Sequence, residues 1–181
     1  MHQQWLTKTS STFATLSAAA VAAVVVVVIA HDNLLLPPDR DFLFFLRSMN
    51  RRLDKHLYLF IKTDEGKWGL PQAPHEPADE HMRNTAEKSL QSALGKALEN
   101  LKVYFVGNAP IAHYRNEDDQ NGTSTVFYHK AQVIHGSLPA AGGANLESSG
   151  VRDWAWLARD EVPKYVEDKQ LADLMTRALV E

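Results

Sequence analysis

The feature that most restricts the fold is one long helical pattern lying among segments typical of strands. Between residues 80 and 99, apolar side chains recur at helical spacing and form one stripe, consisting of Ala86, Leu90, Ala93, Leu94, Ala97 and Leu98. Short runs rich in Val, Tyr, Phe and Trp surround it and predict strands at 57–61, 103–106, 111–114, 125–134 and 154–157. A turn at 64–67 predicts a hairpin-like return through Trp68. Helices are predicted from Asp160 and over about 168–180. This order predicts an α/β fold, in which a mixed sheet carries helices on both faces.

Length and composition limit the class of protein further. The chain has 181 residues, of which 45% are hydrophobic and 23% charged, and its formal net charge is −3. At roughly 150 residues per domain, this length predicts one domain with an appendage. The absence of cysteine excludes disulfide scaffolds, thiolate zinc sites and cysteine nucleophiles. The slightly acidic balance argues against a chain whose main task is to clamp nucleic acid.

Charge distribution divides the chain into three parts: a low-charge apolar segment at 1–36, a basic connector arm at 37–55 and the α/β domain at 56–181. The first part contains an unbroken apolar run over residues 18–30. A membrane-spanning helix needs about 20 such residues, so the run by itself is short for that purpose. Three interpretations stay open, namely a targeting segment, a packed apolar strand or helix, and a membrane anchor.

The connector arm carries four of the candidate binding residues. They are Arg47, Arg51, Arg52 and Lys55, and Asp54 is the only acidic residue between Arg47 and Lys55. Such a cationic run could contact RNA or an acidic partner. The alternative is a solvated connector, which is the commoner role of short charged runs.

The helical segment also carries the spacing of a known motif. From Glu80 onward the chain resembles the Nudix motif: Glu80 matches the first glutamate, Lys88 stands at the arginine position, Leu90 at an apolar position and Gly95 at the closing glycine. Three glutamates of the family pattern are replaced by Ser89, Ser92 and Ala93. The resemblance implies a Nudix-like α/β/α sandwich over residues 56–181.

The three replacements decide the chemistry that this motif can support. Nudix-type hydrolysis uses Mg²⁺ or a similar hard cation, which carboxylate oxygens and substrate phosphates bind. Positions 89, 92 and 93 lie on one face of the predicted helix, and here that face carries two hydroxyls and a methyl group. We therefore expect no catalytic residue, no bound metal and no cofactor. Glu80 and Glu87 remain, and isolated glutamates are usually surface charges.

A narrower resemblance covers the chain from Leu46 to its C-terminus. It rests on an ordered set of segments: residues 50–57, 70–73, 85–90, 107–110 and 113–114, and Trp156 followed by Asp160 and Glu161. Together they resemble a family of Nudix-fold proteins of the mitochondrial ribosomal large subunit whose motif is degenerate. The resemblance implies a structural constituent of the central protuberance in the mitochondrial matrix. Its partners would be neighbouring ribosomal proteins, with limited ribosomal RNA contact and no small-molecule substrate.

One functional alternative stays open. The retained spacing and Glu80 would also suit a Nudix-type hydrolase or binding protein for nucleoside diphosphate derivatives, if metal ligands came from elsewhere in the chain. The histidines do not supply such a site, because no second ligand falls at short spacing beside His129 or His135. Trp154 and Trp156 share one face of a predicted strand, so at least one of them belongs to the core.

Overall fold

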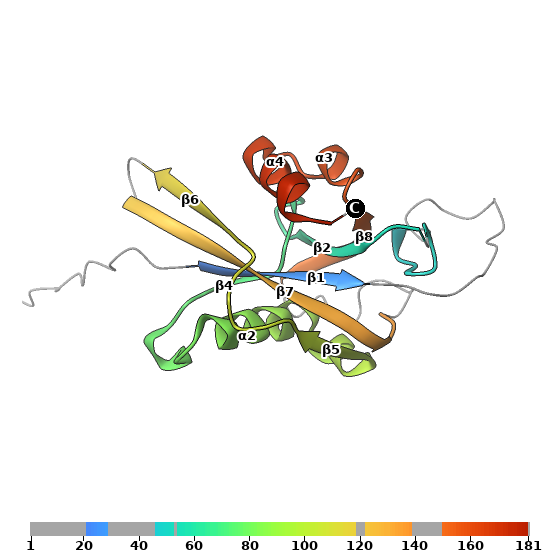
Figure 1. The fold of residues 1–181 in the computed structure, drawn as a ribbon, viewed down its shortest axis with the longest axis horizontal. Helices are drawn as coiled ribbons and strands as arrows, with labels where there is room; N and C mark the ends of the chain where they lie inside the picture. Colours follow the sequence, from blue (N-terminus) through green and yellow to red (C-terminus); the bar gives the residue numbers. More distant parts are fainter. Residues whose placement is uncertain (1–20, 29–45, 53, 119–121, 139–149, 181) are drawn as a thin grey trace, which may run out of the picture.

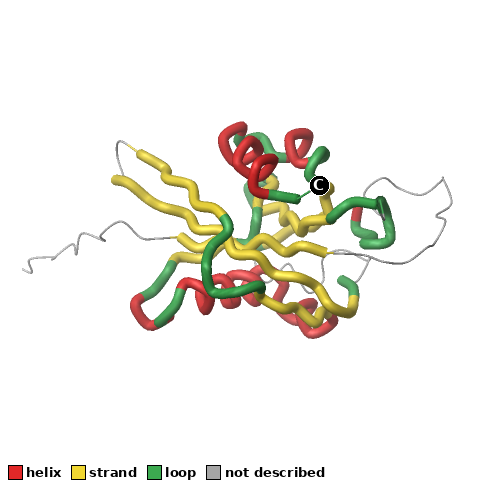
Figure 2. The backbone as a smooth tube through the Cα atoms, viewed as in Figure 1, coloured by secondary structure: helices red, strands yellow, loops and turns green. Residues whose placement is uncertain are grey.

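The computed structural model of this protein describes residues 21–28, 46–52, 54–118, 122–138 and 150–180. The strands are β1 (Val21–Val28), β2 (Leu57–Thr63), β3 (Trp68–Gly69), β4 (Gln72–Pro74), β5 (Leu101–Phe105), β6 (Ala112–Asp118), β7 (Gly122–Gly136) and β8 (Val151–Ala158). The helices are α2 (Met82–Leu94), α3 (Val162–Tyr165) and α4 (Lys169–Ala178), with two 3₁₀ helices, η1 (Pro77–Asp79) and η2 (Gly95–Asn100). The strands, yellow in Figure 2, form one mixed sheet with the main order β3-β2-β1-β7-β5.

Part of the N-terminal apolar run is a strand of this sheet. β1 pairs in parallel with β7 from Val21↔Val126 to Val28↔Val133, and it pairs antiparallel with β2 and β4. A continuous valine-rich run is typical of a strand with neighbours on both sides and packed layers above and below. Residues 21–28 therefore form a strand of the sheet, and the rest of the 1–36 segment lies outside the described residues. In the described ranges, no helix has the length and apolarity needed to cross a bilayer.

Helices cover both faces of the sheet, which confirms the predicted α/β class. Figure 1 shows α2 on one side of the sheet and α3 with α4 on the other. Alternate residues of β2 enter two separate cores: Leu59 packs on the α2 side, whereas Tyr58 and Phe60 pack on the α3–α4 side. Both sets are buried, which explains why the sequence of this strand is a continuous apolar run without alternating polar residues.

The helix predicted at 80–99 is shorter in the structure and ends before the last residues of its apolar stripe. α2 begins at Met82 and ends at Leu94, and the chain continues as η2. Gly95 follows α2 with φ of 51° and ψ of −130°, a backbone conformation that side-chain-bearing residues rarely adopt. Because this glycine redirects the chain, the last two residues of the stripe, Ala97 and Leu98, belong to η2. Ala97 is buried in the same core as the apolar residues of α2.

The remaining predicted strands form as expected, with pairings that the sequence did not specify. β2 and β3 make the predicted antiparallel return. β5 and β6 both pair antiparallel with the long strand β7. Trp154 and Trp156 of β8 are both buried, with ring centroids 6.3 Å apart in an edge-to-face arrangement. Each large buried side chain of this kind stabilises the fold by roughly 1.5–3 kcal/mol.

The candidate Nudix motif and the basic arm

The degenerate motif lies along α2 and the turn before it. Ser89 and Ala93 are buried in the α2 side of the core, with 1% and 6% of their surfaces exposed. The Ser89 hydroxyl donates a hydrogen bond of 2.8 Å to the Ala86 carbonyl oxygen. Ser92 is exposed, and Gly95 follows the end of the helix. Two of the three positions that carry glutamate in the Nudix pattern are therefore sealed between α2 and the sheet, without water access for a hydrated cation.

Glu80 and Lys88 have local roles in this structure. Glu80 is exposed and ends η1 with φ of 45°, where it turns the chain into α2. Lys88, at the motif's arginine position, has 58% of its side chain exposed and forms an ion pair with the carboxylate of Asp79. The described residues contain no group of three or more His, Asp or Glu side chains arranged to hold a metal ion.

Asp79 is the residue of this site that the sequence did not single out. Its side chain is 1% exposed, and it accepts hydrogen bonds from the Thr85 hydroxyl at 2.8 Å and from the Glu76 amide at 3.3 Å. Together with the hydrogen bond from Lys88, these contacts lower the pKa of Asp79 to about 2. The Lys88 pKa is raised by the same hydrogen bond. This carboxylate thus fastens η1 to α2.

The basic arm is tied to β8 near its start and to the turn that follows β8. Arg47 pairs with Asp153 at 2.8 Å, and Arg52 pairs with Asp160 at 2.9 Å. Arg51 has no exposed side-chain surface and donates through Nη1 to Glu161 at 2.8 Å. Because burial removes its guanidinium from the surface, Arg51 is the least accessible of the four candidate binding residues, whose role as contacts for RNA or a partner stays a prediction.

These pairs also set the protonation state of the acidic turn. Burial raises the pKa of Glu161, but hydrogen bonds from Arg51 and from the Ala158 amide outweigh it, so the pKa lies below its usual value. For Asp160, burial likewise raises the pKa and the contact with Arg52 lowers it, with a net lowering. Lys55 lies close enough to contribute to that lowering. The turn stays anionic at neutral pH and neutralises much of the arm.

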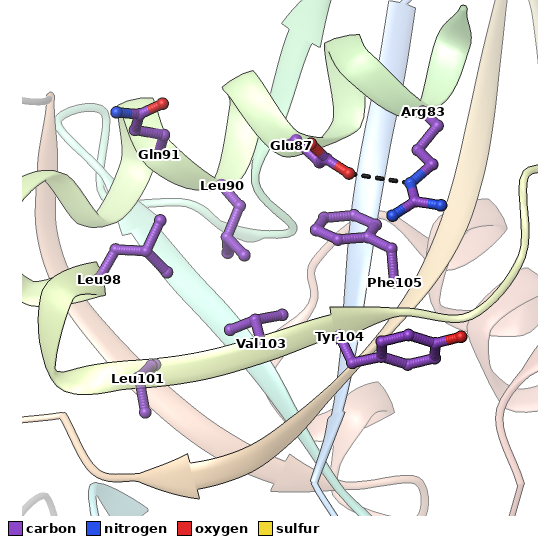
Figure 3. A pocket seen from close by; sticks show the side chains of 9 residues that line it. All are labelled: Arg83, Glu87, Leu90, Gln91, Leu98, Leu101, Val103, Tyr104 and Phe105. Carbon is purple, nitrogen blue, oxygen red and sulfur yellow. Dashed lines mark hydrogen bonds and ion pairs between the residues drawn. The ribbon is translucent and has the colours of Figure 1, made fainter.

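A groove opens between α2 and β5, and Leu90, at the apolar position of the motif, is one of the residues that line it. Figure 3 shows the apolar side chains of Leu90, Leu98, Val103 and Phe105 lying between the helix and the strand. Its volume is ≈ 370 Å³. Arg83 lies at one end, where it contacts Glu87 at 2.9 Å. Ser89, Ser92 and Ala93 are not among the residues that line this groove, so the three replaced glutamate positions lie outside it.

Solved structures with the same arrangement define the class of fold. The chain is similar to the Ap4A hydrolase of C. elegans, with a TM-score of 0.57 and 11% identity over 90% of this chain and 96% of that one. It is also similar to a NUDIX hydrolase from Nitrosomonas europaea, with a TM-score of 0.51 and 16% identity over 88% of this chain and 86% of that one. The protein therefore has a Nudix fold, and at these identities the likeness carries the fold alone.

Sequence similarity is more specific than the fold. The chain is 32% identical to large ribosomal subunit protein mL46 of Bos taurus over 136 residues, covering 70% of this chain and 45% of that protein. It is 27% identical to mL46 of Neurospora crassa over 133 residues, covering 65% of this chain and 33% of that protein. The chain is a homologue of mL46, which confirms the resemblance seen in the sequence. It spans less than half the length of the curated relatives it matches. No family model matches the chain.

Proposed function

We propose that this protein is a non-catalytic structural constituent of the large subunit of the mitochondrial ribosome. The observation that carries the proposal is the similarity to mL46 across 136 residues of this chain. The mitochondrial matrix is the corresponding location. Its partners are other large-subunit proteins, and we place it in the central protuberance, as the sequence resemblance implies.

The state of the degenerate motif supports the absence of catalysis. A hard cation needs several oxygen ligands and keeps bound water. Here the positions of three carboxylates are neutral, and the two that face the sheet are buried. Asp79, the nearby buried carboxylate, is engaged by Lys88 and Thr85. A metal ion would have to displace these partners before it could bind.

The charge pattern supports attachment mainly through proteins. The net charge is −3, whereas a chain embedded in RNA normally carries a basic excess. Within the arm, Arg47 and Arg52 are paired with aspartates on the protein's own surface. Limited contact with ribosomal RNA is proposed at Arg47, Arg52 and Lys55. Such contacts would be salt-dependent.

Sedimentation of a mitochondrial extract through a density gradient tests the proposal. A tagged chain should co-migrate with the large ribosomal subunit at low salt and remain there after mild RNase treatment of exposed RNA. A chain found only in the soluble fractions at the top of the gradient would rule the proposal out.

The second candidate function is a Nudix-type hydrolase or binding protein for nucleoside diphosphate derivatives. It is favoured by the retained motif spacing with Glu80 and by the hydrolase activity in the names of the fold neighbours. Purified protein should then release phosphate or a nucleoside monophosphate from a panel of such compounds with Mg²⁺ or Mn²⁺. No turnover across the panel, together with no ligand-induced rise in melting temperature, would remove this candidate.

A further inference from the structure

The strand β5 forms an open edge of the sheet. Among the described residues it pairs with β7 alone. The amide of Val106 donates to the Lys130 carbonyl of β7 at 2.8 Å, so the backbone groups of this residue point inward. Because successive residues of a strand point their backbone groups to opposite edges, those of Val103 and Phe105 point outward. An outward row of N–H and C=O groups is a template for a further strand.

The apolar groove lies directly beside this edge. It is lined by residues of α2, η2 and β5, the outermost strand of the main order, and no described residue of β7 is among them. The groove therefore opens outward past β5. A strand added to β5 would point every second side chain into the space between Leu90, Leu98 and Val103, visible in Figure 3.

The opposite face of β5 provides the second set of contacts. Tyr104 and Val106 have 57% and 41% of their surfaces exposed, and Ile134 of the neighbouring β7 has 59% exposed. Lys102 and Lys130 lie on the same outward face by strand alternation. Residues 101–106 and 128–136 contain no Asp or Glu, so this face is apolar with a positive border.

We propose that β5 binds an extended segment of a neighbouring ribosomal protein, which adds an antiparallel or parallel strand to the sheet. Its alternate side chains are apolar where they enter the α2–β5 groove, and acidic side chains on its other face meet Lys102 and Lys130. Backbone hydrogen bonds would supply affinity, and the groove and the two lysines would supply selectivity. This inference rests on the proposed function, since it names the surface by which the protein is held.

A segment of this chemistry fits better than the other possible occupants. A second copy of β5 would bring Lys102 side chains from both copies to one face without a carboxylate to offset them. RNA would leave the outward amides of Val103 and Phe105 and the apolar groove without matching groups, because its affinity comes mainly from phosphate contacts.

Hydrogen exchange of the full chain, measured free and inside purified large subunits, tests the inference directly. We expect the outward amides of Val103 and Phe105 to exchange at least ~10-fold more slowly in the particle than in the free chain, as buried ladder amides do. Unchanged exchange of these amides in a co-migrating chain overturns the inference and leaves the proposed function standing. A chain absent from the particle overturns both.

Variants identify the occupant. Val103→Pro removes an outward N–H without removing a bond to β7, and Lys102→Glu reverses one charge of the face. Each should lower the particle-bound fraction at least ~5-fold, whereas Lys164→Glu, on exposed α3, should leave it unchanged. Binding of both variants at the wild-type level overturns the inference. So does protection that disappears on RNase digestion, which would mean RNA, or protection in the free chain at high concentration, which would mean self-pairing.

Discussion

The guanidinium of Arg51 and the carboxylate of Glu161 form a two-armed ion pair between the segment before β2 and the turn after β8. The Nη1–Oε1 distance is 2.8 Å, and Nη2 of Arg51 donates both to Oε2 of Glu161 and to the Trp156 carbonyl oxygen. The arginine side chain is fully buried and that of the glutamate is 15% exposed. Because the Trp156 ring lies in the core, this contact anchors the arm to the centre of the domain.

Removal of Arg51 should therefore be far more costly than removal of its neighbour. Arg51→Ala leaves a partly buried carboxylate without its main partner, a change that typically costs about 3–5 kcal/mol. Arg52→Ala breaks a more exposed pair and should cost at most about 1 kcal/mol. Urea unfolding of the two variants measures the difference. Equal losses would mean that the Arg51 pair contributes no more than a surface ion pair.

The lowered pKa of Asp79 predicts that the free energy of unfolding depends on pH in the acid range. Its pKa is about 2 in the folded protein, against a usual value of 3.8, because Lys88 and then Thr85 stabilise the carboxylate. Between these values the folded state binds fewer protons than the unfolded state, so the free energy of unfolding rises with pH. The stabilisation is complete above a pH of about 4 and is lost as pH falls toward 2.

The variant Asp79→Asn should remove this contribution to the loss of stability at acid pH. Melting temperatures measured at closely spaced pH values between 2 and 5 would show a shallower decline than in the wild type. Lys88→Met should also make the melting temperature less dependent on pH in this range. The double variant should add little to either change, because the two substitutions remove the same interaction. If the melting temperature of Asp79→Asn fell with acid pH as steeply as that of the wild type, Asp79 would not be the source of this dependence.

Most elements of the fold could be predicted from local pattern, whereas their pairing beyond the β2–β3 return could not. The stripe along α2 and the β-branched and aromatic runs of β2, β7 and β8 specify periodicity directly. The valine run of β1 is continuous, so periodicity alone left strand and helix open. The joint pairing of β5 and β6 with β7 depends on the length of β7, which local turn signals do not report.

Residues of the site could be predicted only at positions that the fixed spacing of the Nudix motif covers. Ser89, Ser92 and Ala93 were found because they replace glutamates in a fixed motif. The arm was interpreted from local charge, which cannot report the burial of Arg51 against Glu161, a partner 110 residues away. Asp79 lies outside the motif, and only the η1 turn brings it to Lys88 and Thr85.

Gly136 should be the least replaceable of the glycines that border the sheet edge. Its φ is 96°, and a Cβ there would lie 1.9 Å from the backbone oxygen of Asn100. Gly136→Ala combines backbone strain with overpacking and should cost more than about 3 kcal/mol. Gly107→Ala has a similar φ of 77° in open space and should cost only about 1–2 kcal/mol. Thermal or urea unfolding compares them, and equal costs would show that the Asn100 backbone yields to the added methyl group.

Restoring the glutamates of the Nudix pattern should destabilise the protein instead of creating a metal site. Ser89→Glu and Ala93→Glu each place a carboxylate at a buried position in the core beneath α2. A buried charge without a partner is expected to cost several kcal/mol, about 3–5 if the side chain cannot reach water. Ser92→Glu, at an exposed position of the same helix, should change the free energy of unfolding by less than about 0.5 kcal/mol.

Unfolding measured with and without Mg²⁺ separates the two possibilities. If α2 and the sheet exclude water as the burial of Ser89 indicates, the triple variant should be unstable at every Mg²⁺ concentration and should hydrolyse no nucleoside diphosphate derivative. Recovery of stability in millimolar Mg²⁺, together with turnover, would mean that a hydrated cation can enter between helix and sheet. The proposed absence of catalysis would then rest on the three side chains alone, and not also on the closed packing around them.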